Sequence, residues 1–341
     1  MNRREFLLQS SAVALRPSIT GGQGLRDQGK PYGTAASSFQ LRDGDFAAAL
    51  AREAAILVPE YEMKRGVIEP SPGRYDFSGV DKLLAFARAH AMQLRGHPLV
   101  WHKRNPDWLT EVGAESQLMG YISQVMSRYS GQFHSWDVVN EAIDVTAPGN
   151  LRQTIWLKRF GRDYIDIAFE AARAADPEAM LVYNDWGCEL GAPDNDRFRA
   201  ATLDFLEGAR ARGVPIDALG LQGHLGLSGP QVDQAKLAIF LDRVKAMGFK
   251  ILITEHDVDD DGGAADPATR DRQVADASRR FLDVAAPHAV AVLTWGLSDR
   301  YLDPPSWRQK LMGWSPRRLP LDASLARKPL WTVLSKELAR H

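Results

Sequence analysis

The feature that most constrains the fold is a regular alternation of strand-like and helix-like segments from about residue 32 to the C-terminus. Short apolar or β-branched runs, typical of buried strands, lie at residues 32–37, 55–60, 93–97, 135–140, 180–184, 218–223, 250–255 and 289–295. Segments with helical periodicity separate them, at residues 80–90, 118–129, 162–175, 196–212, 230–247 and 271–284. Eight such units without a Gly-x-Gly-x-x-Gly turn predict an α/β fold, a single (β/α)8 TIM barrel over residues 31–341.

The composition excludes several classes of protein. The chain carries 42 basic and 43 acidic residues, a net charge of −1, so it lacks the basic footprint of a nucleic-acid-binding protein. Its mean hydropathy is −0.29 and it has no run of about 18 apolar residues, which excludes a membrane bundle. Cys188 is the single cysteine, so neither an intramolecular disulfide nor a multi-thiolate metal site can form.

The first thirty residues resemble an export signal followed by a linker. Arg3 and Arg4 precede Phe6 and a short apolar stretch, as in bacterial twin-arginine signals. A Gly-rich segment follows, with glycine at positions 21, 22, 24 and 29. We therefore expect residues 1–30 to be a signal and linker, folded structure to begin near Tyr32, and the protein to be periplasmic or secreted. The alternative is an ordinary N-terminus that contains two adjacent arginines.

Polar and aromatic side chains gather at the C-terminal ends of seven predicted strands. They are Glu60, Lys64, His97, Trp101, Asn140, Glu141, Asn184, Asp185, Gln222, His224, Glu255, Asp257, Trp295, Ser298 and Asp299. In an eight-stranded barrel these ends open onto one face, where the active site is built. Carboxylates, amides and imidazoles hydrogen-bond to hydroxyl groups, and indole rings stack on the apolar face of a sugar. The pattern therefore favours a carbohydrate site.

Glu141 and Glu255 are the candidate catalytic pair. They lie 114 positions apart (255 − 141), about three barrel repeats, which places them after the fourth and seventh strands. Each follows a near-continuous apolar or β-branched run, so each carboxyl group is partly desolvated at the end of a buried strand. Glycosidic cleavage needs one acid to protonate the leaving oxygen and one carboxylate across the anomeric carbon. Taken alone, a glutamate after a strand is more often part of a helix N-cap region or of a salt bridge than a catalytic residue.

Six blocks occur in a fixed order along the chain: Arg95–His102, Trp136–Ala142, Tyr183–Asp185, Gly220–Leu225, Ile253–Glu255 and Thr294–Gly296. Together they resemble glycoside hydrolase family 10, the endo-xylanase family, over about residues 32 to 335. The resemblance implies a (β/α)8 barrel and retaining endo-hydrolysis of β-1,4-linked xylan by double displacement, with Glu141 as acid/base and Glu255 as nucleophile. It implies no metal ion and no organic cofactor. The expected partner is xylan or a xylo-oligosaccharide, without nucleic acid or membrane, and the expected state is a monomer.

The resemblance also implies roles for the residues around this pair. Asp257 and His224 would support the nucleophile, with His224 donating to Glu255 and Asp257 orienting the imidazole. The substrate-binding residues that it implies are Glu60, Lys64, His97, Trp101, Asn140, Trp186, Gln222, His224 and Trp295. Asn140 in particular could bond the sugar 2-hydroxyl, a contact that strengthens in an oxocarbenium-like transition state.

Several positions depart from the family pattern. Tyr61 and Arg104 stand where the family has a sugar-binding Asn and Gln, which alters the glycone subsite next to the attacked sugar. Further departures are Arg65, Trp186–Gly187, His256 and an apparent insertion at residues 302–305. They leave two alternatives open. One is a glycosidase of the same mechanism acting on decorated, glucuronate-bearing xylo-oligosaccharides or on another glycan, and the other is a non-catalytic carbohydrate-binding barrel.

Overall fold

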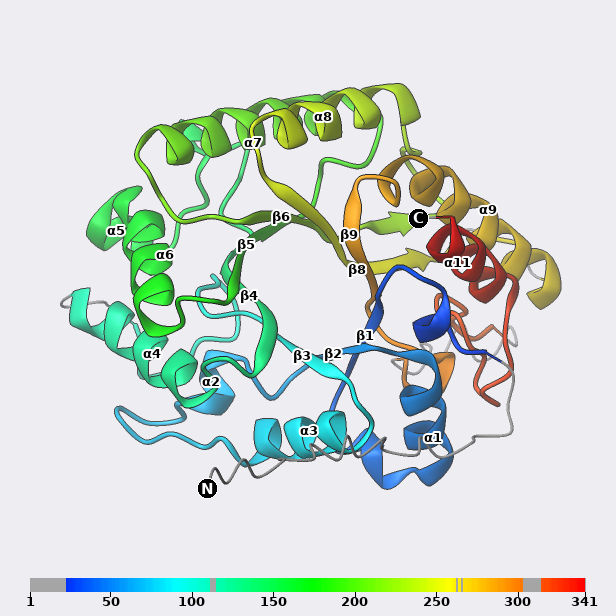
Figure 1. Ribbon diagram of the computed structural model, residues 1–341. Helices are drawn as coiled ribbons and strands as arrows, with labels where there is room; N and C mark the ends of the chain where they lie inside the picture. The colour runs from blue at the N-terminus through cyan, green and yellow to red at the C-terminus, as the bar shows by residue number, and fades with distance from the viewer. Residues whose placement is uncertain (1–22, 111–114, 262, 265, 303–313, 341) are drawn as a thin grey trace, which may run out of the picture.

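A closed barrel of parallel strands forms the centre of the molecule (Figure 1). The computed structural model describes residues 23–110, 115–261, 263–264, 266–302 and 314–340. The strands are β1 (Tyr32–Ala36), β2 (Ile56–Pro59), β3 (Gln93–Gly96), β4 (Phe133–Asn140), β5 (Met180–Asp185), β6 (Ala218–Leu221), β7 (His224–Gly226), β8 (Lys250–Asp259) and β9 (Ala289–Thr294). Their order is β6-β5-β4-β3-β2-β1-β9-β8-β7, and the parallel pairing of β6 with β8 closes the ring. The short strand β7 pairs with the last residues of β8 at the barrel mouth.

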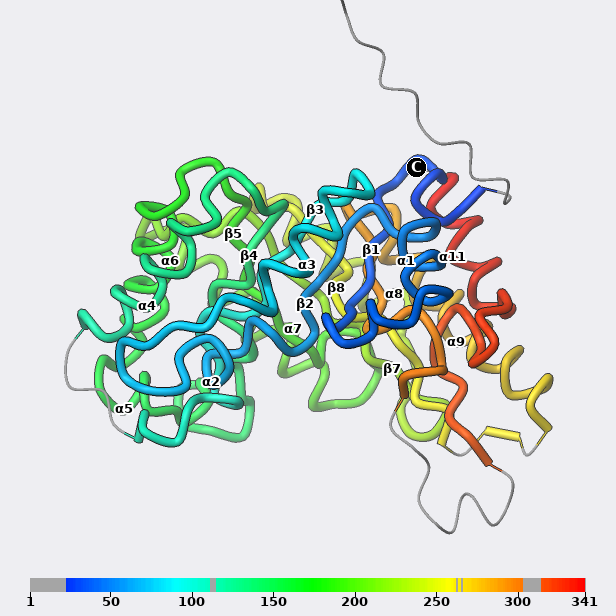
Figure 2. Tube along the Cα trace, turned by 90° about the horizontal axis from the view of Figure 1, so that it is seen from below, coloured from blue at the N-terminus to red at the C-terminus, as the bar shows by residue number. Residues whose placement is uncertain are grey.

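Helices alternate with the strands and surround the barrel (Figures 1 and 2). They are α1 (Gly44–Glu53), α2 (Arg65–Ile68), α3 (Ser78–Ala89), α4 (Glu115–Arg128), α5 (Ile155–Phe160), α6 (Asp163–Ala175), α7 (Pro193–Ala211), α8 (Gln234–Ala246), α9 (Pro267–Ala285) and α11 (Pro329–Ala339). Local sequence sets several of their starts. The side chains of Asp43, Thr154, Asp233 and Asp266 accept backbone N–H groups in the first turns of α1, α5, α8 and α9. Proline opens α7, α9 and α11, where its missing N–H costs no hydrogen bond.

Apolar packing occurs on both sides of the strands. A small cluster that includes Val58, Val182 and Leu252 fills the barrel interior, and a much larger core lies between the strands and the helices. Along β8 the two sides alternate, with Leu252 in the interior cluster and its neighbours Ile251 and Ile253 in the outer core. A filled interior makes the barrel a rigid support for the side chains at its C-terminal end.

The structure confirms the single (β/α)8 barrel that the alternation predicted. All eight predicted strands begin within two residues of an observed strand. The sequence reading did not assign α1, α2, α5, α11 or the three-residue strand β7. Within the described residues, no helix combines the length and the apolar character needed to cross a membrane.

Folded structure begins earlier than Tyr32, which corrects the expected start. Leu25, in the short helix η1 (Leu25–Asp27), is fully buried, and its N–H donates to Glu53 Oε2 at 3.0 Å. Lys30 Nζ donates to the carbonyl of Ala289 at 2.6 Å. Residues 23–30 are therefore part of the barrel domain. The predicted export signal, within residues 1–22, and most of the 302–305 insertion lie outside the described residues.

Candidate active site

Glu255 faces the mouth of the barrel because β8 departs from regular alternation. Strict alternation would place Glu255 on the helix side of the strand, together with Ile251 and Ile253. The register of β8 against β9 shifts between Ile253 and His256, and His256 is the residue that turns towards α9. Irregularities of this kind re-aim side chains next to active sites. The carboxyl group of Glu255 consequently lies in the barrel mouth.

The Glu255 carboxyl group is buried among positive charges and hydrogen-bond donors. Asn184 Nδ2 donates to Oε1 at 2.7 Å, His224 Nε2 lies 3.4 Å from Oε2, and His97 Nδ1 lies 3.7 Å from Oε1. Burial by itself raises the pKa of Glu255, but His97, His224 and Lys64 outweigh this effect and lower the pKa to about 2. Glu255 is therefore an anion at any pH at which the protein is expected to work.

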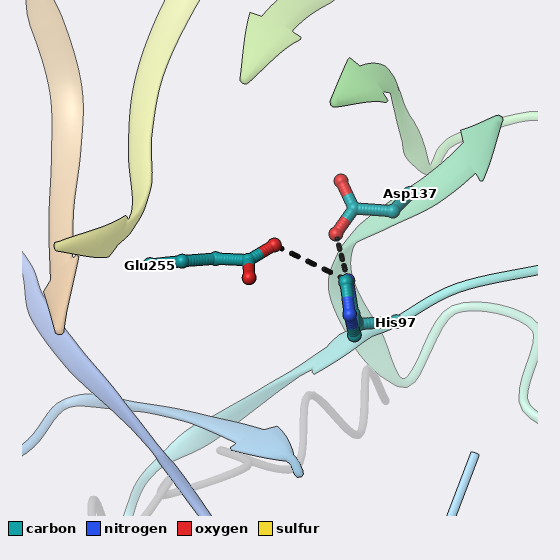
Figure 3. A group of neighbouring side chains, drawn as sticks. All are labelled: His97, Asp137 and Glu255. Carbon is teal, nitrogen blue, oxygen red and sulfur yellow. Dashed lines mark hydrogen bonds and ion pairs between the residues drawn. The ribbon is translucent and has the colours of Figure 1, made fainter. Parts of the chain in front are cut away.

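His97 is held beside Glu255 by Asp137 of β4 (Figure 3). Its Nδ1 lies 2.8 Å from Asp137 Oδ2, and the second carboxylate oxygen of Asp137 accepts a hydrogen bond from Arg95. Arg95 in turn donates to Ser135 Oγ at 2.7 Å. Since all these side chains are buried, the network fixes the orientation of the imidazole ring towards Glu255.

A second histidine lies on the other side of Glu255. His224 Nδ1 is 2.7 Å from Asp257 Oδ1, so His224 lies between Asp257 and Glu255. Burial lowers the pKa of His224, but the charges and hydrogen bonds of Asp257 and Glu255 outweigh it and hold the pKa well above its usual value. His224 is therefore a cation in contact with Glu255 near neutral pH.

Glu141 follows β4 and lies in the same mouth with a backbone φ of +56°. This left-handed conformation is strained for a residue with a side chain and is common at functional sites. Asn140 Nδ2 and Gln222 Nε2 approach Glu141 Oε1 at 3.3 and 3.4 Å. On the other side of the carboxyl group, His102 Nδ1 and Lys103 Nζ each lie 3.8 Å from Oε2. One oxygen of Glu141 therefore faces two amides and the other faces two basic groups.

Both glutamates line one open cleft with a volume of about 470 Å³. Its walls are Lys64, His97, Trp101, His102, Lys103, Glu141, Arg152, Trp186, Gln222, His224, Glu255 and Trp295. Lys64 Nζ lies over the rings of Trp101 and Trp295, 4.8 and 5.4 Å from their centroids. Burial lowers the pKa of Lys64 to about 8, against the raising effect of nearby carboxylates such as Glu255. The cleft therefore offers indole rings for stacking and a cation between them.

Tyr61 and Arg104 line a second hollow of about 480 Å³ that shares Lys64 with the cleft. Both side chains are exposed, and within the described residues the structure records no ion pair for the Arg104 guanidinium. Asp107 is the acidic residue of this hollow. Glu60 is not among the residues that line either hollow, and its Oε2 accepts a hydrogen bond from Ser37 Oγ at 3.1 Å.

Three of the polar strand-end residues serve the fold. Asp185 Oδ1 and Oδ2 accept backbone N–H groups of the loops after β5 and β4 at 2.9 and 3.2 Å. Ser298 Oγ caps the short helix η4 (Asp299–Tyr301), and Asp299 accepts from Lys328 Nζ at 2.6 Å. Asp185, Ser298 and Asp299 therefore make hydrogen bonds that stabilise loops and a helix end. The pattern of polar strand ends predicts more site residues than the structure places in the cleft.

Sequence reasoning missed four residues near the pair. Asp137 lies within the block Trp136–Ala142, but nothing in the neighbouring sequence predicts its hydrogen bonds with Arg95 and His97. His102 and Lys103 directly follow Trp101 and could have been included on that ground. Arg152 belongs to the long loop after β4, where its Nε donates to the carbonyl of Glu141 at 2.9 Å, and nothing in its sequence context predicts this contact.

His97, Asp137 and Glu255 place three ligand atoms within 4.8 Å of one another, which is close enough to consider a metal ion. Their other partners argue against that use. Arg95 already donates to Asp137, and Asn184 already donates to Glu255. A divalent cation would also be repelled by the buried Lys64 and Arg95 side chains. The donor set fits a hydrogen-bonded network better than a metal centre.

The closed barrel, with two buried carboxyl groups facing a cleft lined by indole rings, is that of a barrel glycoside hydrolase. The profile of Glycosyl hydrolase family 10 matches residues 23–337. The chain belongs to this family.

Relatives and solved structures agree with this assignment. The chain is 33% identical to endo-1,4-beta-xylanase 1 of Humicola insolens over 296 residues, covering 84% of this chain and 66% of that protein. It is 31% identical to endo-1,4-beta-xylanase A of Thermoanaerobacterium saccharolyticum, covering 91% of this chain and 27% of that protein. It matches the crystal structure of xylanase 10B from Thermotoga petrophila RKU-1 in complex with xylobiose with a TM-score of 0.81 and 28% identity, covering 94% and 99% of the two chains.

Proposed function

We propose that this protein is a retaining endo-β-1,4-xylanase. The observation that carries the proposal is the environment of Glu255, a buried carboxylate kept ionised by two histidines and a lysine in the same cleft as a second glutamate. Such a pair matches the chemistry of double displacement. Membership of the family and the similarity to named xylanases point to xylan as the substrate.

In the proposed reaction, Glu255 attacks the anomeric carbon while Glu141 donates its proton to the departing glycosidic oxygen. The bond between the two sugars breaks and a glycosyl ester forms on Glu255. Glu141, now a carboxylate, removes a proton from water, and the resulting nucleophile displaces Glu255. His224 and Asp257 keep Glu255 anionic in the free enzyme.

We assign the remaining cleft residues to the sugar that is attacked. Lys64, His97, Asn140 and Gln222 present donors beside the two glutamates, where they can bond ring hydroxyls. Trp101 and Trp295 wall the same space and exclude water from it. Trp186, whose side chain is 42% exposed beside Glu141, offers a stacking surface on the leaving-group side. Asn140 and Glu60 both lie outside the cleft lining, but Asn140 donates to Glu141 Oε1 at 3.3 Å, so Glu60 is the weakest of these assignments.

The first test is the assay of reducing ends released from xylan, which separates a hydrolase from a non-catalytic binding barrel. We expect the first product to be the β-anomer, because two inversions at the same carbon restore its configuration. Proton NMR during the first minutes of hydrolysis distinguishes the anomers before mutarotation. Initial release of the α-anomer would exclude the double displacement.

The pH dependence of the reaction should depend on His224. Replacing His224 by asparagine removes a cation next to Glu255, so the pKa of Glu255 should rise. A protonated Glu255 cannot attack, and activity is lost as the pH falls through its pKa. The acid limb of kcat/KM should therefore move to higher pH in His224→Asn, as measured with an aryl xylobioside in constant-ionic-strength buffers. An unchanged acid limb would mean that His224 does not control Glu255.

A second candidate function is preference for xylan that carries acidic branches. Arg104 brings a permanent positive charge into the hollow next to the cleft, and Tyr61 beside it offers one hydroxyl. A neutral xylose hydroxyl that must donate there meets a guanidinium with no acceptor, which costs about 1–3 kcal/mol, or roughly a five- to hundredfold loss in kcat/KM. A glucuronate carboxylate would instead pair with Arg104.

The Arg104→Gln variant tests this preference directly. We expect the wild-type protein to favour a glucuronate-bearing xylo-oligosaccharide over the neutral one of equal length, and Arg104→Gln to lose most of that preference. The measurement is the ratio of kcat/KM for the two substrates, with Arg88→Gln as the control, because Arg88 is exposed and bonds Gln132 just before β4, at the opposite end of the barrel. Equal ratios in wild type and variant would contradict recognition of the acidic branch by Arg104 and would leave only the proposal of an ordinary xylanase.

We further propose that the protein is exported and acts as a monomer. Support for export comes from the adjacent Arg3 and Arg4 before an apolar stretch. Residues 1–22 would then be the signal, with the barrel domain following directly from residue 23. Support for a monomer comes from the cleft, because every group proposed for the reaction comes from one chain.

A further inference from the structure

The loop between β6 and β7 is held by two buried side chains that the proposed reaction does not use. Gly223 lies in this loop, between Gln222 and His224. Its N–H donates to Glu189 Oε1 at 3.0 Å, and its carbonyl lies 2.8 Å from His256 Nδ1. Both backbone polar groups of Gly223 are therefore bonded: its N–H, in the peptide unit before the Cα, and its carbonyl, in the peptide unit that leads to His224. Its φ of +74°, with the Phe281 ring 3.0 Å from where a Cβ would lie, leaves room for glycine only.

Glu189 connects this loop to the loop after β5. The carboxyl group is almost fully buried, and its second oxygen, Oε2, accepts the N–H of Gly187 at 2.8 Å. Gly187 directly follows Trp186, the aromatic side chain on the leaving-group side of the cleft. One carboxylate therefore fixes the backbone beside Trp186 and the backbone beside His224.

His256, on β8, forms a hydrogen bond with the loop between β6 and β7. A carbonyl can only accept, so Nδ1 of His256 carries the proton and Nε2 accepts from Ser278 Oγ, 2.9 Å away on α9. Burial lowers the pKa of His256, which keeps this imidazole neutral with one donor and one acceptor. The ring is fully buried beside Phe281. His256 directly follows Glu255, and the register of β8 against β9 shifts at this point, where His256 turns towards α9 and Glu255 towards the cleft.

We propose that Glu189 and His256 are positioning residues for the nucleophile: they bond the two peptide units on either side of the Gly223 Cα and so hold His224 between Asp257 and Glu255. The proposal rests on the proposed function, in which Glu255 is the nucleophile. His224 contacts Glu255 at 3.4 Å and Asp257 at 2.7 Å, and it is the residue after Gly223. A shift of the backbone at Gly223 by about 1 Å would break the contacts of His224 with Glu255 and with Asp257. Misplacements of that size cost about 10²-fold in rate.

The test compares His256→Leu, which removes the donor, with His256→Gln, which can still donate from its amide. His288→Leu is the control, because His288 is a half-buried histidine that lies directly before β9, at the opposite end of the barrel. One measurement is kcat/KM for an aryl xylobioside with a good leaving group. The other is the titration of the His224 imidazole by nitrogen-15 NMR in histidine-labelled protein.

We expect His256→Leu to lower kcat/KM by about 10- to 100-fold and to make His224 lose its proton at lower pH than in wild type. His256→Gln should recover most of both, and Glu189→Gln should change them in the same direction as His256→Leu. If His256→Leu does not fold, Ser278→Ala, which frees the ring to rotate, should show a smaller effect of the same sign.

A purely structural role predicts a different result. His256→Leu, Glu189→Gln and Ser278→Ala would then lower Tm while the His224 titration and kcat/KM, measured well below Tm, stayed at their wild-type values. That outcome would overturn the proposal. Failure of the proposed function would give a different result: an inactive wild-type protein or an active Glu255→Ala variant. In that case the His224 titration would still show whether Glu189 and His256 hold the loop.

Discussion

Replacing Glu255 by alanine should lower kcat on xylan by roughly 10⁵-fold, the scale seen when a covalent nucleophile is removed. The groups that contact this carboxyl group are the amide of Asn184 and the imidazoles of His97 and His224, so none of these contacts supplies a second carboxylate. Activated aryl xylobiosides should suffer the same loss as xylan, because a better leaving group does not supply a nucleophile. Release of reducing ends and of the aryl alcohol measures the two substrates.

Azide provides a sharper version of the same experiment. In Glu255→Ala the anion can occupy the vacated space and attack the anomeric carbon directly, so the product should be an α-glycosyl azide. Glu207→Ala, which removes an exposed glutamate from α7, is the matched control and should keep wild-type activity. Turnover of Glu255→Ala above about 1% of wild type without azide would contradict the assignment of Glu255.

The fold was predictable from sequence because its signal repeats. Each βα unit carries the same switch from a β-branched run to a helical period, so eight weak signals support one another. The elements that were missed lack that contrast. β7 is three residues long, and α1 is an Ala-rich helix whose start depends on the Asp43 cap. The glycines in residues 23–30 predict a linker, yet Leu25 is buried and Lys30 donates to backbone carbonyls at the base of the barrel.

The two glutamates were predictable for another reason: each lies at the end of a predicted strand, within a block that resembles the family. What the sequence could not give is the direction in which each side chain points. Alternation along β8 would turn Glu255 away from the cleft, and the shift in register that corrects this is set by pairing with β9. The hydrogen bonds from His256 to the Gly223 carbonyl and from Arg152 to the Glu141 carbonyl likewise join segments that are separated in sequence.

The Glu141→Ala variant should separate the two halves of the reaction. Departure of a poor leaving group, such as a xylose hydroxyl, needs the proton of Glu141, so hydrolysis of xylan should slow by roughly 10²–10⁴-fold. An aryl group that leaves unaided does not need this proton, so glycosylation of Glu255 by an activated xylobioside should remain near the wild-type rate. A burst of aryl alcohol followed by slow turnover would report the accumulated glycosyl ester, since water then lacks its general base.

Azide should rescue Glu141→Ala by a different route from Glu255→Ala. As an anion it attacks the glycosyl ester on Glu255 without needing a base, and this second inversion should give a β-glycosyl azide. The two variants therefore predict products of opposite configuration from one substrate and one nucleophile, and proton NMR distinguishes them. An equal loss on xylan and on the activated substrate, with no azide product, would assign Glu141 a structural role in the cleft. The opposite configurations would instead place the two carboxyl groups on opposite sides of the anomeric carbon, as the double displacement requires.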